Sequence, residues 1–215
     1  MIPEYRIVPW GPFTIKSTID QEFVDILLEK GNESRVNKLD NRKHLAGQIE
    51  HEYYYEENFK EWFCPLFDPY VSAYQMEAIN TAPLIFKDPI IGYEVVSLWI
   101  NYQQMNEYNP PHNHIGPSQA PNDLSFVIWL QIPEEIVKEN KETRHEHNNP
   151  GPGVICFDLG ADMPFSVTRM GFMPMIGDIV IFPSWLQHHV SAFKADVERI
   201  SVSGNLKFTK FNFNQ

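Results

Sequence analysis

The chain has 215 residues, of which 43% are apolar, a share within the normal range for globular proteins. This length suits one domain with a long decoration, or one domain with a small partner. The 28 acidic residues outnumber the 17 lysine and arginine residues, so the formal net charge is −11. Such a charge repels phosphate-rich partners at long range, and the composition therefore disfavours nucleic-acid binding.

Nothing in the sequence predicts a membrane protein or a secreted one. The longest apolar runs, such as residues 179–182, are far too short to span a bilayer. The first residues lack the basic segment and apolar stretch of a signal peptide. Cys64 and Cys156 lack the spacing of metal ligands, and we interpret them as reduced thiols of the core. We therefore predict a cytoplasmic protein.

The first third of the chain has the apolar spacing of helices. Residues 18–21 resemble a capping box, apolar residues then recur at helical spacing, and Gly31 is a natural stop. The polar stretch 32–51 is expected to form a loop with a short helix.

A second helix is expected from about residue 52 to residue 79, where aromatic residues mark one apolar face. Pro65 and Pro69 should kink or split it, because proline removes a helical hydrogen bond. We predict that residues 1–88 form a helical region that packs on the core and supports it.

Beyond Pro83 the pattern changes to short runs in which residues alternate between two faces. In the stretch 93–104, the alternation places Val96 and Leu98 on one face and Asn101 on the other. This period of two predicts a β-strand.

Further strands are expected at residues 124–132, 153–159, 165–168, 178–182, 188–192 and 199–208. Many short strands separated by turn residues favour a sandwich or a barrel. We therefore predict a mainly β (α+β) fold in which residues 89–215 form a jelly-roll. Residues 133–153 interrupt this pattern with a long polar stretch, which we interpret as a loop. Such a loop is either a lid over the site or an insertion without a role.

Three histidines are candidates for a metal site. His112 and His114 are two residues apart, so on an extended strand both imidazoles point to the same side and can reach one ion. Imidazole suits iron, zinc, copper or nickel, although a histidine pair alone is a weak signal. His188 and His189 follow an apolar strand, and neighbours in a strand point to opposite faces. Only one of the two can therefore join a shared site.

Arg199 is a candidate for binding an anion. The alternation in residues 199–203 places Arg199 and Ser201 on the same face. An arginine inside a barrel is costly unless it meets an anion, and its planar fork suits a carboxylate. The alternative is an arginine that faces outward or pairs with Asp196 or Glu198.

Taken in chain order, these motifs resemble those of the 2-oxoglutarate–Fe(II) oxygenase superfamily. The resemblance covers about residues 90–208 and is strongest to a branch with HNHPGS-like, FPSWLxH and RISxSxN motifs. The corresponding stretches here are residues 109–114, 182–188 and 199–203, of which the second is the most specific. The resemblance implies a double-stranded β-helix, a jelly-roll of the cupin-like kind.

The resemblance also implies roles for individual residues. His112, His114 and His188, rather than His189, fall on the ligand positions for Fe(II). Arg199 falls where the family binds the far carboxylate of 2-oxoglutarate, and Ser201 where a hydroxyl assists. The resemblance is less specific for Asn101 and Trp129, which fall near positions that line the cosubstrate pocket.

The implied activity is that of a dioxygenase, a hydroxylase that couples oxidation of its substrate to decarboxylation of 2-oxoglutarate to succinate. One departure concerns the metal, because His114 stands where most of the superfamily has a carboxylate. A third imidazole makes the site more positive by one charge, which affects metal choice. Glu107 or Asp123 is the alternative source of a carboxylate.

Two other functions stay open at this stage. One is a cupin-like enzyme with a three-histidine metal that does not use 2-oxoglutarate, and the other is a non-catalytic jelly-roll that binds a ligand. A second histidine pair at residues 145–147 is interpreted as part of a solvated loop. We expect a small-molecule or peptide substrate of unidentified nature; the oligomeric state is open, with a homodimer among the options.

Overall fold

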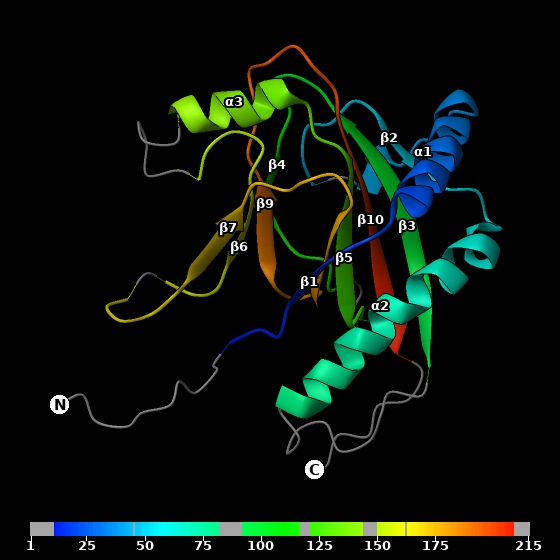
Figure 1. The fold of residues 1–215 in the computed structure, drawn as a ribbon, viewed down its shortest axis with the longest axis horizontal. Helices are drawn as coiled ribbons and strands as arrows, with labels where there is room; N and C mark the ends of the chain where they lie inside the picture. Colours follow the sequence, from blue (N-terminus) through cyan, green and yellow to red (C-terminus); the bar gives the residue numbers. More distant parts are fainter. Residues whose placement is uncertain are drawn as a thin grey trace.

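Two β-sheets that face each other make up the centre of the molecule (Figure 1). The computed structural model describes residues 11–44, 46–81, 92–116, 121–143, 150–161 and 163–208. Within them, the larger sheet has the strand order β1 (Ile15–Thr18), β8 (Asp178–Pro183), β5 (Leu124–Gln131), β10 (Arg199–Phe208), β3 (Tyr93–Gln103), β2 (Glu52–Tyr54). The smaller sheet has the order β4 (Asn109–His112), β9 (Gln187–Val190), β6 (Ile155–Asp158), β7 (Arg169–Phe172). All these pairings are antiparallel, and the predicted double-stranded β-helix is confirmed.

The six-stranded sheet is covered on both faces, which explains why β5 is an almost unbroken apolar run. On the outer face lie the helices α1 (Gln21–Val36), at the right in Figure 1, and α2 (Phe59–Thr81), which crosses the lower part of the view. Phe67 of α2 packs on Phe126 of β5 with ring centroids 4.5 Å apart. On the inner face, Val127 and Trp129 pack toward the smaller sheet.

Helix α1 differs from the sequence-based expectation at both ends. Asp20 caps its first turn, its carboxylate accepting a hydrogen bond from Phe23 N at 2.8 Å, so the cap is Asp20 rather than Thr18. Gly31 does not end the helix, which continues to Val36. A Cβ at Gly31 would lie 2.3 Å from Ile100 Cδ1, so this glycine lets α1 approach the sheet closely.

The second predicted helix begins later than expected. Residues 52–54 form strand β2, which pairs with the edge of β3, so the N-terminal region adds strands to the sheet as well as helices. Pro65 and Pro69 lie within the single helix α2 and do not split it. The helix persists because Phe63 and Phe67 are completely buried against the sheet, and this packing outweighs the lost backbone bonds.

Two strand predictions were wrong in detail. Val96 is 47% exposed and does not share a face with Leu98, because the pairing of β3 with β10 shifts at this point and leaves Val96 in a bulge. The strand predicted at 165–168 lies instead at Arg169–Phe172. Phe165 is fully exposed and has a φ of +62°, which suits a turn rather than a strand.

The stretch 133–153 is not a continuous loop. Helix α3 (Glu134–Thr143) occupies its first half, with Ile136 completely buried. The histidine pair at 145–147 lies outside the described residues. Among the helices that the structure describes, none has the length and apolarity to cross a membrane.

The contact between α2 and β5 should contribute strongly to stability. We expect Phe67→Ala to lower the free energy of unfolding by about 3–5 kcal/mol, because it removes a fully buried ring from an aromatic cluster. Met76→Ala is the control on the same helix, since Met76 is 62% exposed. Urea denaturation measures both, and a similar loss in the two variants would contradict this account of the packing.

Candidate active site

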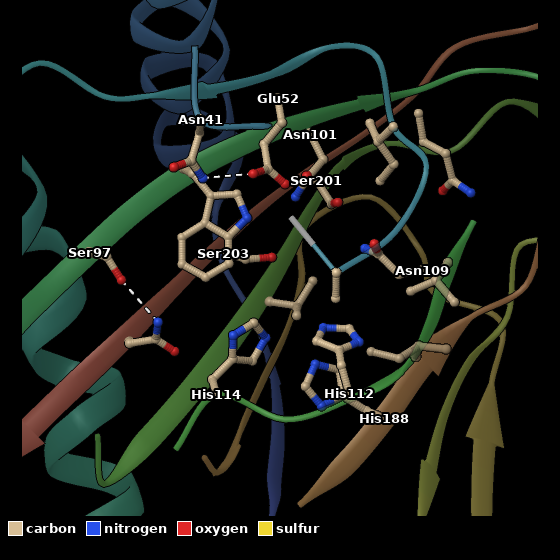
Figure 2. Close-up of a pocket in the computed structure, with 18 of the residues that line it drawn as sticks. Asn41, Glu52, Ser97, Asn101, Asn109, His112, His114, His188, Ser201 and Ser203 are labelled. Atoms are coloured by element: carbon tan, nitrogen blue, oxygen red, sulfur yellow. Dashed lines mark hydrogen bonds between the residues drawn. The ribbon is translucent and has the colours of Figure 1, made fainter. Parts of the chain in front are cut away.

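Three histidines meet between the two sheets. Strand β4 pairs with β9 so that His112 lies directly opposite His188. Their ring centroids are 4.3 Å apart, and His114 lies 4.9 Å from His112 and 5.0 Å from His188. One nitrogen from each ring lies within 4.8 Å of the others, close enough for all three to bind one ion. Figure 2 shows these rings side by side at one end of a pocket.

Hydrogen bonds orient two of the rings. The Nδ1 atom of His112 lies 2.7 Å from the carbonyl of Pro110, and that of His188 lies 3.0 Å from the carbonyl of Leu186. A carbonyl only accepts, so each Nδ1 carries the proton and leaves Nε2 free as a ligand. His189 points away from the cluster and pairs through Nδ1 with the carboxylate of Asp158.

The environment keeps the histidines neutral, as metal ligands must be. Burial, assisted by the neighbouring rings, lowers the pKa of His114 to about 2 and that of His188 to about 3. In the part of the chain that the structure describes, no carboxylate joins the cluster. Glu107 accepts backbone N–H groups of Glu50 and Gln104, which accounts for both of its oxygens.

Asp123, the other alternative ligand, accepts the backbone N–H of Phe208. The donor set is therefore three imidazoles, and its third member is a histidine where a carboxylate is common. A divalent ion bound by these three neutral imidazoles keeps its full charge of two, because the ligands carry no negative charge.

Arg199 lies inside the same pocket as the histidines and is 3% exposed. Its Nη1 donates to Oε1 of Gln103 at 2.8 Å, while its Nε is buried without a partner in the described chain. Burial lowers the pKa of this guanidinium to about 10, so it remains charged at neutral pH. Glu198 is engaged with Arg35 and Gln104 instead. An unpaired buried cation points to an anionic ligand.

Asn101 and Ser201 lie opposite each other in the β3–β10 pairing, and both line the pocket. Trp129 lies opposite Ser201 on the other side of β10, in the apolar layer between the sheets. It is not among the side chains that line the pocket, yet its indole Nε1 is buried and has no hydrogen-bond partner in the described residues. The indole N–H of Trp129 is therefore a second buried donor that lacks an acceptor in the described residues.

The pocket has a volume of about 410 Å³, and several of its lining residues were not anticipated from the sequence. Trp99 and Gln103 continue the alternation that points Asn101 inward, so this pattern contained a signal for them. Asn41 and Glu52 come from the N-terminal region, where no motif marks them. The pairing of β2 with β3 brings Glu52 beside Asn101.

Comparison with known proteins identifies the family. The family model described as "Putative 2OG-Fe(II) oxygenase" matches residues 97–205, which contain all three histidines and Arg199. This chain belongs to that family. No curated protein sequence matches the sequence of this chain.

Several solved structures share its fold. A prolyl-4-hydroxylase of Pseudomonas putida superposes with a TM-score of 0.60 at 12% identity, covering 93% of this chain and 94% of its own. A viral collagen prolyl hydroxylase from Paramecium bursaria Chlorella virus-1 has a TM-score of 0.54 at 12% identity, over 93% and 98% of the two chains. The carbocyclase SnoK of nogalamycin biosynthesis has 0.57 at 12%, over 94% and 82%.

The pocket fits the cofactor and cosubstrate of the family, Fe(II) and 2-oxoglutarate. Three neutral imidazoles on one side of an ion leave positions open for further ligands. The buried guanidinium of Arg199 suits a carboxylate in the same pocket. The described residues of the stretch 133–153 do not line this pocket; Glu135, Glu139 and Pro150 border a second groove, and a lid role for that stretch stays a prediction.

The histidine cluster predicts one metal ion per chain. We expect His188→Ala to weaken binding of Fe(II) or Co(II) by about 100-fold or more, since changes even beyond the ligands cost 10–100-fold. His189→Ala should keep nearly the affinity of the original protein, because His189 faces Asp158. Metal analysis and anaerobic calorimetry measure this, and equal losses in the two variants would rule out the assignment.

Glu52 predicts a pH-dependent stability. Its burial raises its pKa to about 8, so folding retains a proton that the unfolded chain releases near pH 4.5. Stability due to this group is complete below pH 4.5 and is lost as the pH rises toward 8. We expect Glu52→Gln to stabilise the protein increasingly over this range, by up to about 1.4 kcal/mol per pH unit. A stability difference that did not change with pH, measured by urea denaturation, would contradict the raised pKa.

Proposed function

We propose that this oxygenase is a hydroxylase that couples oxidation of a C–H bond to the conversion of 2-oxoglutarate into succinate and CO2. His112, His114 and His188 hold the iron, and Arg199 holds the far carboxylate of 2-oxoglutarate. The observation that carries the proposal is the buried, carboxylate-free guanidinium of Arg199 in the histidine pocket. A three-histidine enzyme that does not use 2-oxoglutarate has no need of a buried cation at this position.

The other residues have supporting roles in this proposal. Ser201 is next to Arg199 on the same face of β10 and offers a hydroxyl to the carboxylate. Trp129, opposite Ser201, packs in the apolar layer behind this face of the pocket and keeps a buried indole N–H without a partner in the described residues. Gln103 accepts from Arg199 Nη1 and thereby fixes the guanidinium before the anion arrives.

The iron, when bound, supplies the oxidation, in which one atom of O2 enters the substrate and the other enters succinate. The chain itself positions the reactants and limits access of water. Val127, Ile155 and Val190 line the pocket near the histidines and make that side apolar. The similar structures also favour hydroxylation, since two of them are prolyl hydroxylases and one of these two was obtained with 2-oxoglutarate.

Anaerobic titration tests the role of Arg199. Addition of 2-oxoglutarate to the Fe(II) protein should produce a visible charge-transfer band. We expect Arg199→Ala to raise the 2-oxoglutarate Kd by roughly 100-fold, because loss of one partner of a buried charge pair costs about 2–5 kcal/mol. His188→Ala should abolish the band.

Arg169→Ala is the matched control, since Arg169 lies on the exposed strand β7 and pairs with Asp158. It should leave the band and the Kd unchanged. In air, the original protein should release succinate when a substrate is present. Absence of the band together with absence of succinate over a panel of peptides and metabolites would exclude the proposal.

A further inference from the structure

The pocket contains a second polar region besides Arg199. Four polar side chains line it above the histidines in Figure 2, three of them close together and Asn109 nearer to His112. We call them the acceptor cluster: Asn41, Glu52, Asn101 and Asn109. Asn41 and Glu52 belong to the N-terminal region, which lies outside the part of the chain that matches the family model. This cluster has no role in the binding of iron or 2-oxoglutarate proposed above, apart from the position of Asn101 beside Ser201.

Glu52 is the most unusual member of the cluster. It is 2% exposed, and one carboxyl oxygen accepts a hydrogen bond from Asn41 Nδ2 at 2.7 Å. Among the described residues it has no cationic partner, and the charge of Asp40, which raises its pKa further, is also negative. Arg199 lies in the same pocket but two strands away, where it contacts Gln103. A buried carboxyl without a counter-ion points to a partner that arrives from outside.

The three asparagine side chains of the cluster all lack a hydrogen-bond donor for their amide oxygen. The Oδ1 atoms of Asn41, Asn101 and Asn109 are all buried, and none has a hydrogen-bond donor within the described structure. All three are acceptors, as the carboxyl of Glu52 is once it is ionised. Arg199, in contrast, has an unpartnered donor in the pocket, its Nε. The pocket therefore lacks an acceptor at Arg199 and donors at the acceptor cluster.

We propose that the acceptor cluster binds a cationic nitrogen group of the substrate, an ammonium or a guanidinium, with Glu52 as its counter-ion. This inference rests on the proposed oxygenase function, because it names the substrate class of the same site. A cationic nitrogen group supplies the counter-ion that Glu52 lacks, and its N–H groups supply the donors that the amide oxygens lack. The net charge of −11 also favours the approach of a cation.

The cluster is held in place before any ligand arrives. Asn41 N donates to the backbone carbonyl of Glu52 at 3.0 Å, so these two residues are paired through both main chain and side chain. The segment between them is fastened to the end of β3 and the start of β4. Gln48 N donates to Tyr108 O at 3.0 Å, and Gly47 lies so close that a Cβ would be 2.2 Å from Asn109 Oδ1. Such preorganisation favours selective binding of one kind of group.

Matched pairs of ligands test this inference. L-Arginine and L-citrulline, and L-lysine and L-norleucine, differ by one positive charge at similar size. Putrescine and 1,4-butanediol differ by two. Calorimetry would be run anaerobically on the protein with Fe(II) and 2-oxoglutarate, and again on the metal-free protein. We expect at least one cation to bind about tenfold or more tightly than its neutral partner.

Proton release provides a second readout that is independent of activity. Burial raises the pKa of Glu52 to about 8, so at pH 7 the carboxyl is mostly protonated in the empty pocket. A cation that binds beside it should displace about one proton, measured as a dependence of the binding heat on the buffer. Glu52→Gln should abolish both the proton release and the preference for the cation, while the charge-transfer band with 2-oxoglutarate stays intact.

Glu107→Gln is the control variant. Glu107 is a carboxylate that bonds the backbone of the same segment but does not line the pocket. It should keep the preference and the proton release. Equal affinities within every pair, failure of all six probes to bind, or an unchanged preference in Glu52→Gln would overturn the inference. Since the metal-free measurements involve neither iron nor 2-oxoglutarate, such a result would leave the proposed oxygenase function standing.

Discussion

The pairing of β4 with β9 is the constraint on which the rest of the site depends. It sets His112 opposite His188, and a backbone bond from His114 N to Ser184 O holds the third histidine nearby. Strand β4 is the edge of its sheet, which is where a strand can contain Pro110 and its neighbouring proline. The pairing is irregular at these prolines, and the carbonyl of Pro110 accepts the Nδ1 proton of His112. The irregular edge strand therefore also orients the imidazole of His112.

The six-stranded sheet separates two environments. Its outer face is apolar and packs on α1 and α2, which supplies the stability of the core. Its inner face carries polar groups into the pocket, where buried atoms without a partner are costly. The packing on the outer face offsets the free-energy cost of keeping unpartnered polar groups on the inner face, where they can bind ligands. Donors lie toward Arg199 and acceptors toward Glu52, so the pocket has a defined polarity.

This polarity also bears on the charge of the loaded site. Three neutral imidazoles leave an Fe(II) ion with its full charge, one unit more than a site with a carboxylate ligand. Arg199 adds another positive charge, and the two carboxylates of 2-oxoglutarate offset part of the total. An ionised Glu52 paired with a cationic substrate group adds no net charge. The replacement of a carboxylate ligand by His114 is thus compatible with the binding groups around it.

How much could be predicted from the sequence depended on the range of the interactions involved. Period-two alternation predicted the jelly-roll and made His112, His114 and Arg199 candidates, because strand geometry is local. The choice of His188 over His189, and the role of Arg199, came from the resemblance to the oxygenase superfamily. Local signals failed at Gly31 and at residues 52–54, where contact with the sheet overrode them. The tertiary structure alone brought Glu52 beside Asn101, since strand pairing joins residues far apart in the chain. The sequence by itself thus determined the fold and the candidate metal-binding chemistry; burial and pairing, which are long-range, decided what surrounds them.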